Sequence, residues 1–144
     1  MYLGTFDPSD NVVTQLASWN NSETEVVFSV AGGANTSVIH SANMNDGLMI
    51  GCDVDQHHYG ESVLTSAVKN MELSTHNMIA HYYDGTFPGG QSLRLSASED
   101  GVQLPMQTSR FDSFTEDDYD QIYSELADGT ITVPSNYDEL VTFF

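Results

Sequence analysis

Two apolar segments of this chain each lead into charged residues. The segment 48–50 runs into Asp53 and Asp55, and the segment 63–68 ends at Lys69. We interpret both segments as buried strands of an open α/β sheet, in which ligands bind in the crevice beyond the carboxyl ends of the strands. Carboxylates after one strand and an ammonium group after the next therefore predict a polar binding crevice at that edge.

Lys69 stands out because the chain contains almost no other basic residue. It is the only lysine among 144 residues, in a composition of 3 Lys and Arg against 21 Asp and Glu, with a formal net charge of −18. The presence of this single lysine near two aspartates favours a functional role for Lys69. A salt bridge near the start of a helix explains the same pattern equally well, so both interpretations stay open.

Asp53 and Asp55 allow three kinds of chemistry. A carboxylate at a strand end accepts hydrogen bonds from the neighbouring hydroxyls of a sugar. The D-x-D spacing is also similar to the nucleophile motif of haloacid-dehalogenase-like hydrolases, but His57 stands where that family has Thr or Val. The nearby His58 and Glu61 add possible metal ligands. Because the loop lacks a second His or Cys pair at ligand spacing, we expect no metal site.

A glycine turn and an aromatic residue fall at the same expected edge. Gly32 and Gly33 follow an apolar run and precede a predicted helix, where free backbone N–H groups approach a ligand closely. The motif is neither G-x-G-x-x-G nor a P-loop, and a tight turn without a ligand also explains it. Phe6 ends the first predicted strand, where its ring either stacks on a flat base or fills the rim of the core.

The composition is that of a folded domain. With 40% hydrophobic residues, 7 Tyr and 7 Phe, residues 1–144 suffice for a single domain with its own core. No stretch of 18 residues is apolar throughout, so we expect no transmembrane helix. The N-terminus lacks the basic and apolar regions of a signal peptide. Cys52 is the only cysteine, which excludes an intramolecular disulfide, and its apolar surroundings favour a small buried side chain over a reactive thiolate.

The charge excludes two classes of partner. Binding to nucleic acid requires clustered Lys and Arg, and so does binding to anionic membranes, and this chain has no such cluster. The acidic residues are spread along the chain, with one cluster at 116–120. Diffuse acid with scarce lysine is typical of proteins that work at high salt, where screening relieves the repulsion. A dedicated basic partner is the alternative explanation.

Strand and helix patterns alternate along the chain. We expect strands at 2–6, 25–30, 47–52, 62–68, 92–96 and 102–104, a short extended piece at 130–133, and helices through 12–19, 36–44, 70–83 and 115–126. Ser9 or Asp10 caps the first helix. This alternation predicts an α/β layered fold with a mainly parallel sheet.

Six segments in this order resemble one known family. They are 2–6 (YLGTF), 27–33 (VFSVAGG), 50–56 (IGCDVDQ), 63–70 (VLTSAVKN), 84–90 (DGTFPGG) and 128–135 (DGTITVPS). Together they resemble the basic membrane protein family, whose members are substrate-binding lipoproteins of ABC importers and include purine-nucleoside receptors. The resemblance covers nearly all of the chain. Asn35 and Ser37 depart from it, because the family usually has glycines there.

The resemblance implies a transport function without chemistry. The family has two lobes of type I periplasmic-binding-protein architecture, and this chain is similar to the C-terminal lobe alone, a three-layer α/β/α unit. The family binds a nucleoside, here expected to be a purine, between the lobes, and a membrane permease recognises the closed form. The resemblance therefore implies an extracytoplasmic protein that is not an enzyme and needs no cofactor. The N-terminal lobe, the lipobox cysteine and the signal peptide of the family are not in this sequence.

The resemblance also assigns roles to individual residues. It implies that Asp53 holds the ribose hydroxyls, that Lys69 contacts the ribose or organises Asp53, and that Gly32 and Gly33 line the cleft. We add Phe6 as the residue that stacks on the base. Two alternatives stay open: an Asp-dependent hydrolase, and an acidic interaction module that forms a homodimer through the cleft face and the apolar tail at 140–144.

Overall fold

The chain forms two compact units. The computed structural model describes residues 2–20, 22 and 24–143. Unit 1 consists of Met1–Lys69 and Val102–Ser113, and unit 2 of Asn70–Gly101 and Phe114–Phe144. The expectation of a single lobe over residues 1–144 stays a prediction. In the part of the chain that the structure describes, no helix combines the length and the apolar character needed to cross a membrane.

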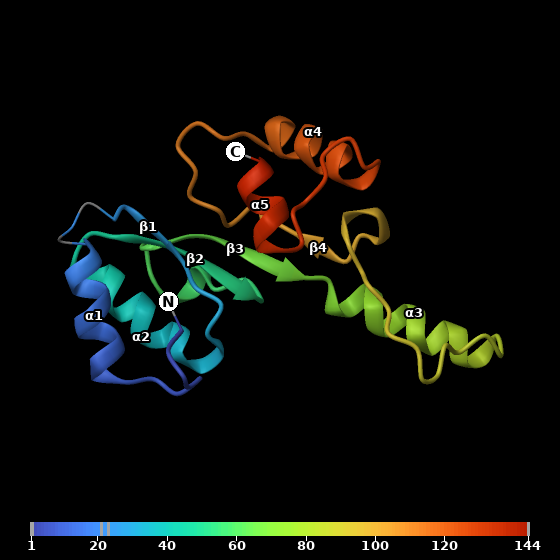
Figure 1. The fold of residues 1–144 in the computed structure, drawn as a ribbon, viewed down its shortest axis with the longest axis horizontal. Coiled ribbons are helices and arrows are strands. Elements are labelled where there is room, and N and C mark those ends of the chain that lie inside the picture. The colour runs from blue at the N-terminus through green and yellow to red at the C-terminus, as the bar shows by residue number, and fades with distance from the viewer. Residues whose placement is uncertain (1, 21, 23, 144) are drawn as a thin grey trace. The chain divides into compact units, whose positions relative to one another are not determined.

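Unit 1 contains a mainly parallel sheet. Its strands are β1 (Val26–Phe28), β2 (Leu48–Asp53), β3 (Val63–Lys69) and β4 (Val102–Gln103), in the spatial order β1-β2-β3-β4. The first three run parallel and β4 pairs antiparallel with β3 (Figure 1). This confirms the expected α/β class, and it places the carboxyl ends of β1, β2 and β3 along one edge.

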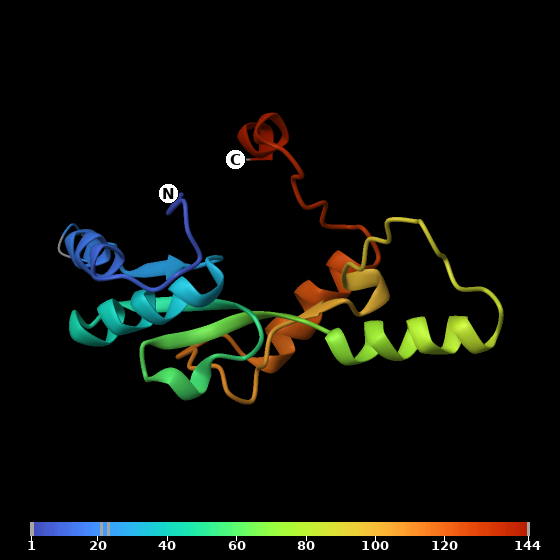
Figure 2. The same ribbon diagram turned by 90° about the horizontal axis from the view of Figure 1, so that it is seen from below.

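Two helices of unit 1 pack on this sheet. They are α1 (Asp10–Asn20) and α2 (Asn35–Met44), which lie side by side (Figure 2). The Ser9 hydroxyl accepts the N–H of Val12 and so caps α1, as the sequence predicts. The buried apolar core joins both helices to β2 and β3, and its members are Val12, Leu16, Val38, Ile39, Met49 and Val63. Short 3-10 turns, η1 (Gly32–Ala34) and η2 (His57–Tyr59), follow β1 and β2.

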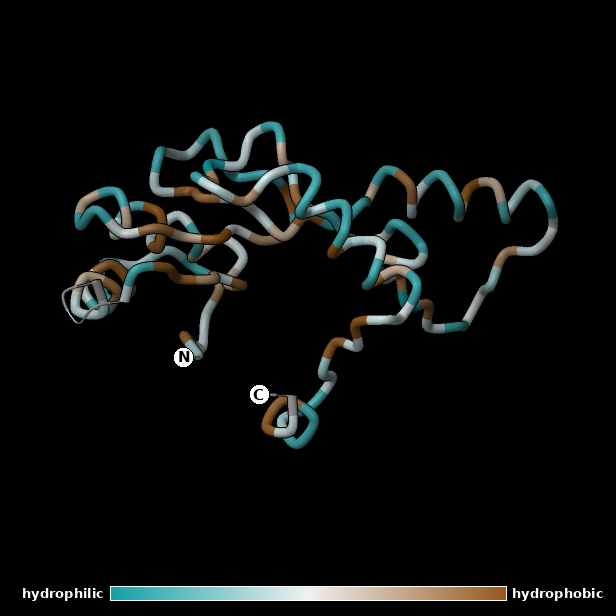
Figure 3. The backbone as a smooth tube through the Cα atoms, turned by 90° about the horizontal axis from the view of Figure 1, so that it is seen from above, coloured by the Kyte–Doolittle hydropathy of each residue, from teal (hydrophilic) through white to brown (hydrophobic). Residues whose placement is uncertain are grey.

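Unit 2 is helical and has little core of its own. It contains α3 (Met71–Tyr83), the 3-10 turn η3 (Ala97–Glu99), α4 (Glu116–Ala127) and α5 (Tyr137–Phe143). None of the residues described in α3 or α4 is buried. Figure 3 shows hydrophobic and hydrophilic positions following one another along α3.

Three extended segments expected from the sequence do not form strands. In the segment 2–6, Gly4 has a φ of +72°, which breaks an extended backbone. In the segment 92–96, Ser96 instead begins η3, because its side chain and that of Glu99 form a capping box. In the segment 130–133, the N–H of Ile131 donates to the carbonyl of Glu125 and closes the end of α4.

The apolar tail predicted at 140–144 falls largely within a helix. α5 covers Tyr137–Phe143, with Asn136 and Glu139 hydrogen-bonded to each other at its start. Leu140 and Val141 are exposed, as a contact surface requires. Phe144 and the side chain of Phe143 lie outside the described residues.

A buried polar network holds the carboxyl edge of the sheet together. Asn35, at the start of α2, accepts hydrogen bonds from the hydroxyl of Ser29 (2.7 Å) and the N–H of Ala31 (3.2 Å). Its amide nitrogen donates to the side-chain oxygen of Gln56 (3.4 Å), whose backbone N–H donates to the hydroxyl of Ser66 (3.0 Å). The network therefore joins the segment after β1, the helix α2, the loop after β2 and the strand β3.

The acidic residues find few basic partners. Among the described residues, Lys and Arg make two ion pairs with carboxylates, Lys69 with Asp53 and Arg110 with Glu61. The 21 Asp and Glu outnumber the 3 Lys and Arg, so the formal net charge of −18 is not compensated within the chain. A strong net charge of one sign destabilises the compact state through self-repulsion.

The core of unit 1 predicts unequal effects of two methionine substitutions. Met49 is fully buried in β2, whereas Met44 in α2 is 68% exposed. We expect Met49→Ala to lower the free energy of unfolding by about 2 to 5 kcal/mol, because it leaves a cavity. Met44→Ala, the matched control, should change it by no more than about 0.5 kcal/mol. Urea unfolding followed by Trp19 fluorescence measures both, and equal losses would contradict this core.

The polar network predicts a second difference. Asn35→Ala removes the acceptor of the buried Ser29 hydroxyl and of the part-buried Ala31 N–H, and we expect it to lower the free energy of unfolding by about 1 to 3 kcal/mol. Asn77→Ala, on the exposed surface of α3, is the control and should cost nearly nothing. An Asn35→Ala protein as stable as the control would show that the network contributes little.

The excess of acid predicts a dependence on salt. We expect the free energy of unfolding to rise between about 0.1 M and about 1 M KCl, because the screening length falls from about 10 Å to about 3 Å. Thermal unfolding followed by circular dichroism measures this rise. Equal ionic strengths of NaCl should give the same rise, since screening does not depend on the identity of the ion. A melting temperature that falls with salt would reject this explanation of the composition.

Candidate functional site

An ion pair closes the ends of two neighbouring strands. Asp53 is the last residue of β2 and Lys69 the last residue of β3, and Asp53 lies opposite Val68 in the parallel register. The ammonium nitrogen of Lys69 lies 2.5 Å from a carboxylate oxygen of Asp53. The structure thus brings these two side chains together at the expected edge, while their role in binding a ligand stays a prediction.

The pair is charged and accessible. The hydrogen bond from Lys69 lowers the pKa of Asp53, a second hydrogen bond from Cys52 lowers it further, and the pKa of Lys69 is raised by the same ion pair. The carboxyl group of Asp53 therefore stays ionised at a pH at which an ordinary aspartate begins to take up a proton. The side chains of Lys69 and Asp53 are 61% and 49% exposed, so a solute can reach both.

The backbone at Asp53 is strained. Its φ is +73°, and the N–H of Val54 donates to the carbonyl of Cys52 at 2.9 Å. This three-residue turn has the positive φ of the rarer, less stable kind of γ-turn. Strained backbone persists where its surroundings enforce it, and it is concentrated at functional sites.

Cys52 is a structural neighbour of this site. Burial first, and then its hydrogen bond with Asp53, raises the pKa of its thiol. The protonated thiol donates to Asp53 at 3.4 Å. A thiol held in its neutral form is a poor nucleophile, as the sequence predicts for this residue.

Asp55 points into the protein, in contrast to Asp53. It accepts hydrogen bonds from the hydroxyl of Thr108 (2.6 Å), and from the backbone N–H and ring of His57 (3.1 and 2.9 Å). Partial burial raises its pKa, but these hydrogen bonds, with Thr108 first, outweigh burial and leave the pKa lowered. The oxygens of Asp55 are therefore used inside unit 1. Among the described residues, no three His, Cys, Asp or Glu side chains are grouped as metal ligands.

Arg110 fixes the segment that carries Thr108. Its guanidinium donates to the carbonyls of Val63 (2.8 Å) and His57 (3.3 Å) and to the carboxylate of Glu61 (3.1 Å). The sequence analysis did not predict this role of Arg110. The scarcity of arginine in this chain was the signal that could have suggested it, by the same reasoning that singled out Lys69.

The glycine turn meets Phe6 at the same edge of the sheet. Gly32 has a φ of +53°, and a Cβ atom there would lie 3.3 Å from the ring of Phe6. A Cβ atom at Gly33 would lie 2.9 Å from the carbonyl oxygen of Phe6, too close for any other residue. The ring of Phe6 packs on this turn and remains 73% exposed. Because β1 and β2 are parallel, the turn after β1 lies at the edge that carries Asp53.

Four buried polar residues behind this edge were not predicted as important. They are Ser29, Asn35, Gln56 and Ser66, the members of the polar network. Ser37 has a similar task, because its hydroxyl accepts the N–H of Ser9 at 2.9 Å and anchors the start of α1. Asn35 and Ser37 therefore both position neighbouring backbone.

Comparison with known proteins identifies the family. The sequence model of the Bmp family, described as ABC transporter substrate-binding protein PnrA-like, matches residues 1–137. The ABC transporter nucleoside-binding protein BmpA of Lactococcus lactis subsp. cremoris (strain MG1363) is 29% identical over 152 residues, which cover 93% of this chain and 43% of that protein.

Two solved structures share the fold. A transcriptional activator of the comK gene from Bacillus halodurans superposes with a TM-score of 0.70 at 18% identity, covering 92% of this chain and 45% of that one. An ABC transporter solute-binding protein from Aeropyrum pernix K1 superposes with a TM-score of 0.67 at 18% identity, covering 96% and 48%. The chain thus spans less than half the length of the relatives it matches.

These matches bear on one of the two alternatives left open by the sequence. The matched family consists of substrate-binding proteins of ABC transporters rather than enzymes, so the Asp-dependent hydrolase is rejected. Since the match extends over residues 1–137 and the fold agrees with it, this chain belongs to the Bmp family of PnrA-like ABC transporter substrate-binding proteins.

Proposed function

We propose that this chain forms one wall of a nucleoside-binding cleft in an ABC transporter substrate-binding protein. The observation that carries the proposal is the exposed, charged pair of Asp53 and Lys69 at the carboxyl edge of a parallel sheet. That edge is where open α/β sheets bind ligands. The nucleoside-binding function of the related L. lactis protein supports the choice of ligand.

Each site residue has a distinct task in this proposal. The carboxylate of Asp53 accepts hydrogen bonds from the 2′- and 3′-hydroxyls of the ribose. Lys69 keeps Asp53 ionised and oriented and donates to the ribose. The exposed ring of Phe6 stacks on the base, for which a purine offers the larger face. Gly32 and Gly33 let the backbone approach the ligand without a Cβ atom between them.

The second wall of the cleft comes from a second lobe. In this proposal the two lobes close over the nucleoside by a hinge, and a membrane permease recognises the closed form outside the cytoplasm. Binding has no chemical step and needs no metal or cofactor. This chain alone offers half of the contacts, so its own affinity for nucleosides is weak.

The role of Asp53 can be tested with the chain by itself. We expect adenosine at millimolar concentration to shift the amide resonances of Asp53, Lys69 and Gly32 in an NMR titration. Asp53→Asn should weaken this binding roughly tenfold or more, because a hydrogen bond to a charged group contributes about 1.5 to 3 kcal/mol. Asp46→Asn is the matched control, since Asp46 also has a positive φ but precedes β2 and so lies at its opposite end.

A second ligand isolates the contact with the ribose. The unmodified chain should bind adenosine more tightly than 2′-deoxyadenosine, and Asp53→Asn should lose that preference. The two proteins and the two ligands together form a double-mutant cycle. If Asp53→Asn kept the preference, Asp53 would not hold the ribose. Calorimetry that measured a micromolar or tighter Kd for the unmodified chain would reject the single-wall proposal.

A further inference from the structure

A polar hollow lies between the helix α2 and the turn η2. This α2–η2 hollow has a volume of about 170 Å³ and is lined by Thr36, Ile39, His40 and Asn43 of α2 and by Tyr59 of η2. The residues of α2 are one, three or four positions apart, so they share one face of the helix. Ile39 is buried, whereas the other four lining side chains are exposed to solvent.

Asn43 joins the two sides of the hollow. Its side-chain oxygen accepts the N–H of Ser62 at 3.4 Å. A Cβ atom at Gly60 would lie 2.6 Å from the amide nitrogen of Asn43, so this side chain lies directly against the backbone of the loop after η2. Asn43 is therefore already oriented before any ligand arrives, and less conformational entropy is lost when it binds one.

An unpaired hydroxyl lies next to Asn43. Ser62 is only 6% exposed, and its hydroxyl oxygen has no hydrogen-bond partner among the residues that the structure describes. A buried polar atom without a partner costs free energy and is unusual in a native structure. A polar molecule bound beside Asn43 would supply the missing partner.

An aromatic ring borders the same hollow. The side chain of Tyr59 is 51% exposed, and the ring of His58 packs against it with 4.1 Å between the ring centroids. A supported ring of this kind offers a flat apolar face, while its hydroxyl stays available for hydrogen bonds. Thr36, His40 and Asn43 add further donors and acceptors around it. Sugars present such a combination in reverse, with C–H groups on one face of the ring and hydroxyls at its edge.

Charge restricts the ligand to neutral molecules. The lining of the α2–η2 hollow, as far as the structure describes it, contains no Asp, Glu, Lys or Arg. An anion has no basic partner there and is repelled by a chain with a formal net charge of −18. A cation finds no carboxylate in the lining. The hydrogen-bonding groups that remain suit hydroxyls.

We infer that the α2–η2 hollow binds a neutral sugar. One face of the sugar ring lies on Tyr59, and its hydroxyls pair with Asn43 and His40. A second hollow of about 220 Å³ shares Thr36 and His40 with the first, so the ligand can extend across α2 by a further sugar unit. This site goes beyond the proposed nucleoside cleft and does not depend on it, since its lining includes neither Asp53 nor Lys69.

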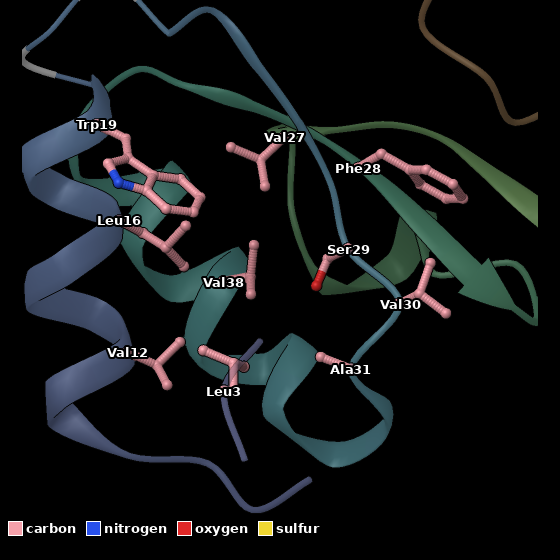
Figure 4. A pocket seen from close by; sticks show the side chains of 10 residues that line it. All are labelled: Leu3, Val12, Leu16, Trp19, Val27, Phe28, Ser29, Val30, Ala31 and Val38. Carbon is pink, nitrogen blue, oxygen red and sulfur yellow. The ribbon is translucent and has the colours of Figure 1, made fainter. Parts of the chain in front are cut away.

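The apolar pocket beside β1 provides an internal reference. It has a volume of about 110 Å³, and Figure 4 shows Leu3, Leu16 and Trp19 gathered in it together with Val27. This mainly apolar lining offers a sugar few hydrogen bonds. Because Trp19 is the only tryptophan, its fluorescence reports on this pocket alone.

An NMR titration of the full chain with methyl β-D-glucopyranoside tests the inference. We expect the sugar at millimolar concentration to shift the amide resonances of His40, Asn43 and Tyr59 saturably and to leave the emission of Trp19 unchanged. The matching glucuronide, which carries a carboxylate, should bind more weakly because of its charge. Cyclohexanol, a ring of the same size with a single hydroxyl, should not shift these amides.

Matched variants locate the sugar. Tyr59→Ala removes the ring face and should weaken binding roughly tenfold, whereas Tyr59→Phe keeps that face and should bind nearly as well. Tyr137→Ala, at a tyrosine of unit 2 that is 76% exposed, should change nothing. Adenosine should still shift Asp53 in the Tyr59→Ala protein, which separates this site from the nucleoside cleft.

Three results would overturn the inference. The first is the absence of saturable shifts in the unmodified chain. The second is equal binding of the glucuronide or of cyclohexanol at the same amides. The third is a set of shifts that Tyr59→Ala leaves unchanged or that appear at Asp53 and Lys69 instead, because the sugar would then occupy another part of the chain.

Discussion

The amide of Asn35 is the constraint on which the carboxyl edge of the sheet depends. Its oxygen accepts from the segment after β1, and its nitrogen donates to Gln56 in the loop after β2. Gln56 in turn donates to the carbonyl of Cys52 at 3.2 Å, one residue before Asp53. The network fits because Gly51 has no side chain: a Cβ atom there would lie 2.7 Å from the hydroxyl of Ser66. The position of Asp53 is therefore set by buried amides and hydroxyls rather than by apolar packing.

Asp53 and Asp55 have different tasks because their surroundings differ. Asp53 and Asp55 are two residues apart, and both have a lowered pKa. Asp55 owes its lowered pKa to hydrogen bonds inside unit 1, which outweigh the cost of burial and engage both of its carboxylate oxygens. Asp53 owes it first to Lys69, an exposed partner that a sugar hydroxyl can share. A D-x-D motif thus supplies one structural and one accessible carboxylate, which suits binding better than nucleophilic catalysis.

The sequence predicted the features that a local pattern determines. It did not predict the features that depend on residues distant in the chain. Asp53 and Lys69 each end a predicted strand, and the carboxyl ends of parallel strands lie at the same edge of a sheet. The structure brings the two side chains together there. The strand expected at 2–6 has suitable residues, but a strand forms only beside a partner, and Gly4 turns the backbone away instead. The role of Asn35 could not be predicted, because its partner Gln56 lies 21 residues away. A local sequence pattern does not show which distant side chain such a residue meets.

The strain at Asp53 connects the network to the proposed function. A glycine adopts a φ of +73° without steric cost, so stability alone would favour glycine at this strand end. The carboxylate is kept although its backbone is unfavourable, and the network behind Cys52 enforces the conformation. Strain of this kind is accepted where the side chain has a task that a relaxed residue cannot perform. In the proposed function that task is to hold a ligand, which agrees with a carboxylate that is half exposed and whose main partner, Lys69, is exposed as well.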